Sequence, residues 1–388
     1  LFALMHQTVF AADVTNVLGN DACQALLAEG NVFAAKREFQ NALNKYLLAA
    51  KADPTASTPF SSISNVLFDA SRWAGGDNAM KLRQQAEAAA RKALQLASND
   101  PLAEEILRAI QEDQPPPLHV PSQAAQQLES EGEVLFQSGN YADAQQKYEQ
   151  AAQVDPLYST AWVFAGDCFY RQNKWAEAET RFRKATEIEP LNGQAWRFFS
   201  DALAAQGKRA EAESALLNGI AAQPSQLPNW DKLTRLRAAV GFPLTPLQLV
   251  RKAQAKIDPS NGKSTIVVDP SGSADDNSSN LGVWLVYAAA SNNAKEKSEG
   301  KPALSSFEIE IAAWRAALAA AAEIATNSSK KLTDPGLLKM QMLAKENQLE
   351  PAVFLLIYKE SYRSDFEAWK KMHPNGVKKF VDAYGLRP

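Results

Sequence analysis

The stretch that decides the fold is GNYADAQQKYEQAAQVDP, residues 139–156, which recurs in altered form as NKWAEAETRFRKATEIEP at residues 173–190. Both copies keep an alanine, an aromatic residue, a second alanine and a closing proline in the same places, while most residues between them differ. Packed positions respond to side-chain volume, whereas exposed positions tolerate change. The pair therefore indicates a structural unit that is repeated along the chain.

The repeat has a period of 34 residues, as the steps from Gly132 to Gly166 to Ser200 show. Four further columns keep this spacing: Ala144, Ala178 and Ala212; Tyr148, Phe182 and Leu216; Pro156, Pro190 and Pro224; Trp162, Trp196 and Trp230. An upstream unit at residues 23–56 repeats the offsets with Gly30, Ala42, Tyr46, Ala49 and Pro54. Over residues 125–226 this order of residue types resembles the tetratricopeptide repeat (TPR) family.

The resemblance implies two antiparallel helices per unit, and the residue types explain why such units stack. Gly132 and Gly166 allow a neighbouring helix to come close, and Tyr148 and Phe182 fill the space that the small residues leave. The prolines suit the start of a unit and would break its interior. We therefore expect an all-α fold, a right-handed α-solenoid of TPR helical hairpins followed by a C-terminal α-helical domain.

The chain is expected to divide into five segments, since its length exceeds that of one domain. They are an N-terminal segment at 1–22, a TPR-like helical block at 23–112, a proline-rich linker at 113–122, three TPR units with a capping helix at 123–241, and a helical domain of unassigned family at 242–388. Apolar spacing and breaker residues predict helices at 61–74, 78–98, 101–112, 281–291, 304–327, 334–347, 351–358, 363–372 and 375–385. STIVVDPSG, from Ser264, predicts one strand.

Composition limits the classes of partner and the compartment. A net charge of −3 and a pI near 5.8 provide no basic field, so we expect no nucleic acid partner. Cys23 and Cys168 are predicted to be small apolar fillers inside helices. No apolar run in the sequence is long enough for a transmembrane span. Residues 1–11 resemble the end of a signal peptide, which suggests a periplasmic or secreted protein, but a short buried helix in a cytoplasmic protein has the same pattern.

Three motifs suggest chemistry but lack the residues that the chemistry needs. Gly262-Lys263-Ser264 lacks the first glycine of a phosphate loop, and the segment from Asp269 lacks the glycine and glutamate of a calcium loop. Ser328 and Lys331 lie at the end of a predicted helix, where lysine interacts favourably with the terminal carbonyls. His6, His119 and His373 are far apart. We therefore expect no catalytic residue, cofactor or metal, and the alternative is an accessory TPR array that delivers substrate to a catalytic C-terminal domain.

The resemblance also implies that the first helix of each unit carries the ligand contacts. Helical spacing places nine residues on that face: Glu129, Glu133, Phe136, Val163, Asp167, Tyr170, Arg171, Arg197 and Asp201. Family members that grip chaperone tails present lysine, arginine and asparagine there, whereas this face is rich in acids. We therefore predict a non-enzymatic scaffold that holds a protein or peptide with cationic and apolar groups. The partner and the oligomeric state stay undetermined.

The last hairpin, residues 363–385, allows two interpretations. Lys370, Lys371, Lys378 and Lys379 flank apolar residues, a pattern that suits a membrane surface or an oligomer contact. The interpretation that we favour places Phe366, Trp369, Phe380 and Tyr384 in the core, with the lysines facing water.

Overall fold

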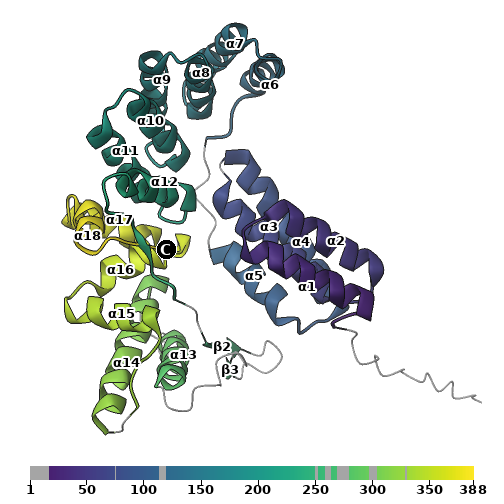
Figure 1. The fold of residues 1–388 in the computed structure, drawn as a ribbon, viewed down its shortest axis with the longest axis vertical. Helices are drawn as coiled ribbons and strands as arrows, with labels where there is room; N and C mark the ends of the chain where they lie inside the picture. The colour runs from purple at the N-terminus through teal and green to yellow at the C-terminus, as the bar shows by residue number, and fades with distance from the viewer. Residues whose placement is uncertain are drawn as a thin grey trace, which may run out of the picture. The chain divides into compact units, whose positions relative to one another are not determined.

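Two compact units make up the chain, residues 1–114 and residues 115–388, and each is described by itself (Figure 1). The computed structural model describes residues 17–74, 76–112, 119–249, 252–257, 264–268, 279–296, 304–327 and 330–388. The signal-peptide prediction for residues 1–11 lies outside these ranges. So do the linker prolines and most of the three motifs tested for phosphate, calcium and nucleophile chemistry.

The first unit consists of five helices. They are α1 (Asp21–Ala35), α2 (Phe39–Ala52), α3 (Thr58–Trp73), α4 (Gly76–Leu96) and α5 (Pro101–Glu112). Helices α1 and α2 are the upstream repeat, because a Cβ on Gly30 would lie 2.3 Å from the Tyr46 ring. The pair α3 and α4 imitates a repeat with Ser64 in the place of glycine, and the buried Ser64 hydroxyl donates to the Ala86 carbonyl at 2.8 Å.

The second unit begins with the three regular repeats. Their helices are α6 (Gln123–Gln137), α7 (Tyr141–Val154), α8 (Ser159–Arg171), α9 (Trp175–Ile188), α10 (Gly193–Ala205) and α11 (Arg209–Ala222). Each helix packs on the next, so that the antiparallel pairs follow one another in a row (Figure 1). Helix α12 (Leu227–Ala238) packs on α10 and α11, where the sequence predicted the capping helix.

Contacts between glycine and an aromatic ring explain the 34-residue period. A Cβ on Gly132 would lie 2.7 Å from the Tyr148 ring, and one on Gly166 would lie 2.5 Å from the Phe182 ring. Neither contact is possible for a residue with a side chain unless the ring moves. The alanines of the second helices, Ala144, Ala178 and Ala212, are fully buried. The all-α solenoid of TPR hairpins is thereby confirmed, and its packing rests on the residues that the period identified.

The C-terminal part of the second unit is also helical. It contains α13 (Asn280–Glu296), α14 (Ser306–Asn327), α15 (Pro335–Lys345), α16 (Leu349–Leu356), the 3₁₀ turn η2 (Glu360–Tyr362), α17 (Arg363–Met372) and α18 (Gly376–Tyr384). Predicted helix boundaries agree with these to within a few residues, except that α13 continues to Glu296. Phe366, Trp369 and Phe380 are buried, as the core interpretation of the last hairpin requires, but Tyr384 is only half-buried, and Lys370 is half-buried and bonds to a backbone carbonyl.

Two short strand pairs accompany these helices. β1 (Thr245–Pro246) pairs in parallel with β4 (Leu386–Arg387), and β2 (Ala253–Ile257) pairs antiparallel with β3 (Ser264–Val268). The predicted strand is β3. Its partner β2 was missed because AQAKI lacks the β-branched run that marks a strand.

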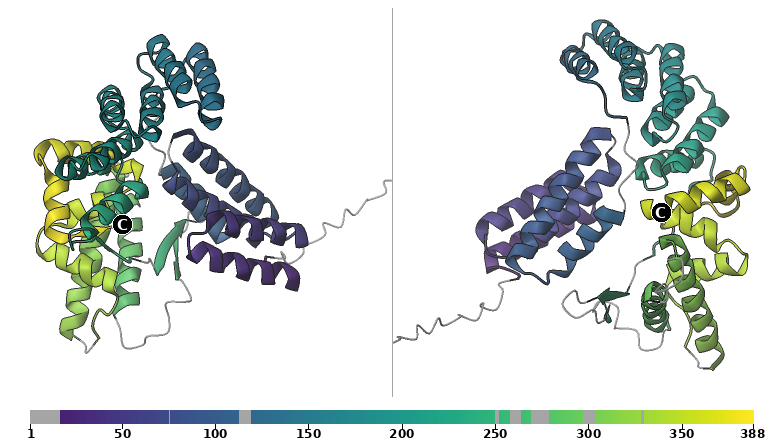
Figure 2. Two further views of the ribbon diagram at one scale, coloured as in Figure 1. Left: turned by 45° about the horizontal axis from the view of Figure 1, so that its top comes forward. Right: turned by 180° about the vertical axis from the view of Figure 1, so that it is seen from behind.

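One hydrophobic core runs from the last repeat into the C-terminal helices. It includes Leu216 and Ile220 of α11, Trp230 of α12, Trp284 of α13 and Phe380 of α18. The two views of Figure 2 show the C-terminal helices beside α11 and α12. A domain boundary at residue 242 stays a prediction, although this core contains residues from both sides of it.

Cationic side chains of the C-terminal helices donate hydrogen bonds to the last backbone carbonyls of α11. Arg363 donates to the Ala222 carbonyl at 2.5 Å, and Lys370 donates to the Ala221 carbonyl at 2.9 Å. The last carbonyls of a helix have no partner inside the helix and carry partial negative charge. The last repeat thus receives from these residues part of the capping that a solenoid end requires.

Candidate partner-binding surface

The predicted contact residues lie on α6, α8 and α10, the first helices of the three repeats. Helix α8 contacts α10 directly, so these helices are neighbours across the row. We call the first-helix surface the exposed and half-buried members of the predicted set: Glu129, Glu133, Phe136, Asp167, Tyr170, Arg171, Arg197 and Asp201. Val163 was predicted to belong to it, but it is 2% exposed and packs in a core with Ala178, Phe182 and Ala195.

Three of the four acids on this surface are held by side chains of other helices or turns. The Tyr158 hydroxyl donates to Glu129 at 2.5 Å, and the Tyr148 hydroxyl donates to Glu133 at 3.1 Å. Asp201 forms an ion pair with Lys232 of α12. Burial first, and then the Glu133 charge, raise the pKa of Tyr148 far above its usual value, so this phenol remains a donor. These acids therefore connect neighbouring helices, and Lys232 compensates the charge of Asp201.

Asp167, at the centre of the surface, is less well compensated. Its nearest cation is Arg171, with 3.8 Å between Nε and Oδ2, which is too long for a hydrogen bond. Burial raises the pKa of Asp167, the charges of Asp201 and Glu133 raise it further, and Arg171 only partly opposes them. The folded chain therefore holds this carboxylate in a setting that disfavours its charge.

Arg197 is a cation on the same surface, and it too lacks a full set of partners. Its Nη1 atom is buried and makes no hydrogen bond. Burial lowers the pKa of the Arg197 guanidinium, and the Asp201 charge partly opposes that shift. The guanidinium carbon lies 5.4 Å from the centre of the Phe198 ring. Arg197 thus has donor capacity that no described residue satisfies.

Aromatic side chains lie beside these charges. Phe136 meets Tyr141 edge to face at 5.2 Å, and Tyr170 meets Trp175 at 4.6 Å. The Arg171 guanidinium lies 5.8 Å from the Phe136 ring and so connects α8 to α6. These half-buried rings offer apolar area that is held in place, which reduces the entropy lost when a ligand binds.

Lys232, Tyr148 and Tyr158 shape the charge of this surface, and the sequence analysis did not assign them to it. Lys232 follows Asp201 by 31 positions, and Tyr158 follows Glu129 by 29. Only the stacking of consecutive helices brings such pairs together. Tyr148 had been identified as a packing residue, and its hydroxyl has this second role.

The described ranges contain neither a cluster of metal ligands nor a membrane-spanning helix. No group of three or more His, Cys, Asp or Glu residues there could hold a metal ion. Among the described helices, none is long and apolar enough to cross a membrane. Cys23 and Cys168 are free and buried, as predicted for fillers, and burial raises the pKa of the Cys168 thiol to about 12.

Comparison with known proteins supports the repeat assignment. A family model described as tetratricopeptide repeat matches residues 130–188 and 169–228. No curated protein matches the chain.

Three solved structures are similar to parts of the chain. The first TPR of Spaghetti (RPAP3) bound to HSP90 peptide SRMEEVD is 23% identical, with 32% of this chain and 98% of that chain covered and a TM-score of 0.29. YrrB, a TPR protein with an unusual peptide-binding site, is 18% identical, with 53% and 89% covered and a TM-score of 0.27. The TPR2AB domain of yeast Sti1 in a pHSP90 complex is 16% identical, with 55% and 96% covered and a TM-score of 0.28.

At such identities and scores these three structures say nothing about the partner of this chain. The family match and the Gly–aromatic packing of α6 to α11 agree on the same residues. Residues 130–228 are therefore tetratricopeptide repeats.

Proposed function

We propose that the chain is a non-enzymatic interaction scaffold whose first-helix surface binds an extended peptide segment of a protein partner. The observation that carries this proposal is the pair of incompletely satisfied charges, Asp167 and Arg197, among half-buried aromatic rings. Buried polar groups in proteins are normally hydrogen-bonded, and those that are not require an explanation. A ligand that supplies the missing hydrogen-bond partners would explain why these two groups lack them.

An extended peptide can supply the hydrogen-bond partners that Asp167 and Arg197 lack. Its backbone N–H groups can donate to Asp167, and its carbonyl oxygens can accept from the Arg197 guanidinium, whose buried Nη1 must turn outward to reach them. Tyr170 and Phe136 provide apolar contact area for its side chains. A cationic side chain in the peptide would relieve the repulsion among Asp167, Asp201 and Glu133 that raises the pKa of Asp167. This preference agrees with the cationic and apolar ligand that the sequence analysis favoured.

The alternative, an array that serves a catalytic C-terminal domain, has no specific observation in its favour. The most buried carboxylate network of that region, around Glu310, is filled by Tyr287, Trp314 and Tyr362. We therefore place the proposed activity in binding alone.

Selection from a random peptide display library against the full chain tests the proposal. Peptides selected on the wild type are compared for capture by Tyr170→Ala/Arg197→Ala and by a control, Gln150→Ala/Lys184→Ala. The control also removes one positive charge but changes exposed residues of the second helices α7 and α9. We expect capture to fall at least about tenfold for the first variant only.

Circular dichroism must show that both variants keep their helical content. Equal capture by the surface variant and the wild type would place peptide binding elsewhere. Equal loss in both variants would point to a general charge effect.

A further inference from the structure

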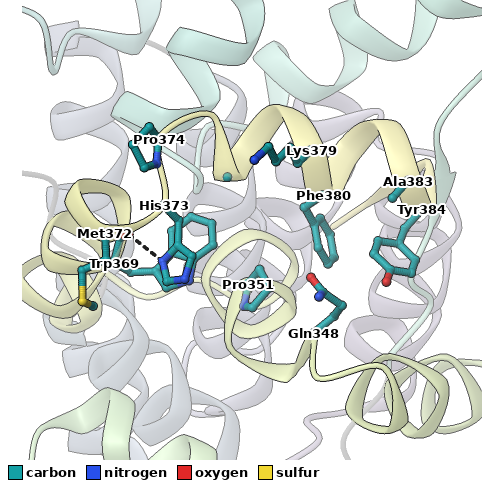
Figure 3. A pocket seen from close by; sticks show the side chains of 11 residues that line it. Gln348, Pro351, Trp369, Met372, His373, Pro374, Lys379, Phe380, Ala383 and Tyr384 are labelled. Atoms are coloured by element: carbon teal, nitrogen blue, oxygen red, sulfur yellow. Dashed lines mark hydrogen bonds between the residues drawn. The ribbon is translucent and has the colours of Figure 1, made fainter.

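A second concave site lies in the C-terminal helices, more than a hundred residues after the first-helix surface. A cavity of about 400 Å³ opens between the start of α16 and the hairpin of α17 and α18 (Figure 3). Its walls include Pro351, Trp369, His373, Phe380 and Tyr384, with Lys379 at the same opening. This volume is within the range of about 300–1,000 Å³ that is typical of ligand sites.

The wall of the cavity is preorganised. His373 stacks on Trp369 with ring centres 5.0 Å apart, and its Nδ1–H donates to the Trp369 carbonyl at 3.0 Å. The turn that carries His373 ends at Gly376, where a Cβ would lie 2.5 Å from the Trp369 indole. Glycine at this position therefore allows the indole to form the wall. Because these rings are already held in place, little side-chain entropy is lost when a ligand binds.

One unpaired lysine, Lys379, lines the cavity, and a second, Lys371, lies on α17 two residues after the wall residue Trp369. Lys371 and Lys379 are exposed, and no described residue forms an ion pair with either. Two neighbouring acids have other partners: Glu346 accepts from the wall residue Tyr384 at 2.7 Å, and Asp382 pairs with Lys378 and Arg237. The site thus combines an aromatic recess with positive charge that lacks a counter-charge. Complementarity requires an anionic ligand with an apolar group.

We propose that this cavity holds one large apolar side chain of an acidic peptide segment, with carboxylates beside that side chain facing Lys371 and Lys379. The site is separate from the first-helix surface and prefers the opposite ligand charge, so the proposal goes beyond the function proposed above. The chain would then contact two chemically different segments, a cationic one on the repeats and an acidic one here.

An anionic membrane fits the same lysines less well. Apolar groups that insert into a membrane must protrude, yet Trp369 and Phe380 are only 6% and 2% exposed and line a recess. Met372 protrudes, with 71% of its surface exposed, but it is a single side chain. Each lysine near an anionic membrane contributes about 1 kcal/mol, so two unpaired lysines give weak adsorption. The concave shape therefore favours a peptide.

Two variants separate the apolar and the charged parts of the site. Ala383→Trp fills the cavity from an exposed position on α18 and leaves the buried core unchanged. Lys371→Glu/Lys379→Glu reverses the charge at the opening. The matched control is Lys36→Glu/Lys51→Glu, which changes the net charge equally but on exposed residues of the first unit.

The probe is a set of three fluorescein-labelled nonapeptides: a tryptophan flanked by glutamates, the same peptide with alanine for tryptophan, and one with lysines for the glutamates. Fluorescence anisotropy with the full chain measures affinity. We expect the acidic tryptophan peptide to bind at least about tenfold more tightly than the other two. Ala383→Trp and the lysine reversal should each remove that difference, and the control should keep it.

Other outcomes would overturn the proposal. They are equal binding of the three peptides, no binding of the acidic tryptophan peptide at millimolar protein, or binding that survives Ala383→Trp. Cosedimentation with phosphatidylserine vesicles that is lost in the lysine reversal but kept in Ala383→Trp would assign the surface to a membrane. Tyr170→Ala/Arg197→Ala should leave acidic peptide binding unchanged, so failure at this site is distinguishable from failure of the first-helix surface.

Discussion

The three regular repeats and the C-terminal helices of the same unit achieve tight packing in different ways. In the first two of these repeats a ring lies against a glycine, Tyr148 against Gly132 and Phe182 against Gly166, and the third repeat has Leu216 and Ser200 at these positions. In the C-terminal helices, rings pack on one another: Trp284 meets Trp314 at 5.6 Å, and Phe307 stacks on Phe354 at 4.0 Å. The first arrangement is local and periodic, whereas the second depends on residues far apart in the chain.

A buried carboxylate makes the contrast sharper. Glu310 is 5% exposed and accepts from Tyr287, Trp314 and Tyr362 at 2.6, 2.9 and 3.0 Å. The repeats also bury a carboxylate, Glu179, but two of its donors are the cations Arg183 and Lys208, whereas Glu310 accepts from neutral side chains. The two regions should therefore fail for different reasons when they are mutated, and four substitutions test this.

The largest effect is expected for Glu310→Ala. It removes the acceptor that three buried donors share, at about 1–3 kcal/mol for each lost hydrogen bond before relaxation, so we expect a loss of about 4 kcal/mol in the free energy of unfolding. Urea denaturation of the full chain measures the change, and hydrogen exchange should show lost protection in α13, α14 and η2. Glu310→Gln keeps one acceptor and should cost much less. Equal losses for the two variants would mean that packing around Glu310, not its hydrogen bonds, stabilises the region.

The corresponding change in the repeats is Gly166→Ala. Its methyl group would lie 2.5 Å from the Phe182 ring, so overpacking should destabilise the chain by about 2 kcal/mol. Lost protection should be confined to α8, α9 and their neighbours, because each repeat contacts only the next. The double variant Gly166→Ala/Phe182→Leu should recover part of the loss. Gly139→Ala is no substitute control, since Gly139 has positive φ and would add backbone strain.

A third substitution acts where the two regions meet. Arg237 of α12, 9% exposed, pairs with Glu213 of α11 and Asp382 of α18, both at 2.5 Å. Arg237→Ala leaves both partly buried carboxylates without this cation, and we expect a loss of about 2 kcal/mol. Hydrogen exchange should then rise on α12 and α18 together. If it rises on one of them alone, Arg237 does not couple the two regions.

The smallest effect concerns Asp167→Asn. The pKa of Asp167 is raised in the folded state, so the folded chain binds this proton more tightly than the unfolded chain does, and its stability falls as pH rises through the folded pKa. At pH 7 the Asn variant should be as stable as the wild type or more stable, by up to about 0.5 kcal/mol. As pH falls toward 4, the wild type should gain stability relative to the variant. Urea midpoints at pH 7 and pH 4 measure this, and a shift in the opposite direction would show that Arg171 compensates Asp167 fully.

The same contrast explains how much could be predicted from the sequence. The repeats were predictable because Gly132, Gly166 and their rings recur at a fixed interval, and the C-terminal helices were found from apolar spacing and breakers such as Pro335 and Gly376. The environment of Glu310 could not be predicted, because its three donors come from α13, α14 and η2.

Contacts across the chain also limited the prediction of sites. Helical spacing identified the first-helix surface but put Val163 on it, because spacing within one helix does not show what the next helix covers. It could not reveal that Tyr158 and Lys232 engage Glu129 and Asp201. Nor could it reveal the cavity between α16 and α18, whose walls meet only in the folded chain.

The shared core at the end of α11 determines where the array can grow. A unit of 34 residues could be inserted between α7 and α8, because the inserted repeat would pack on another repeat on each side. No unit could be added after α12 without displacing Arg363 and Lys370 from the α11 carbonyls and breaking the Trp230 core. In this protein repeats can therefore be inserted inside the array but not after α12, where the array packs on C-terminal helices of the same chain.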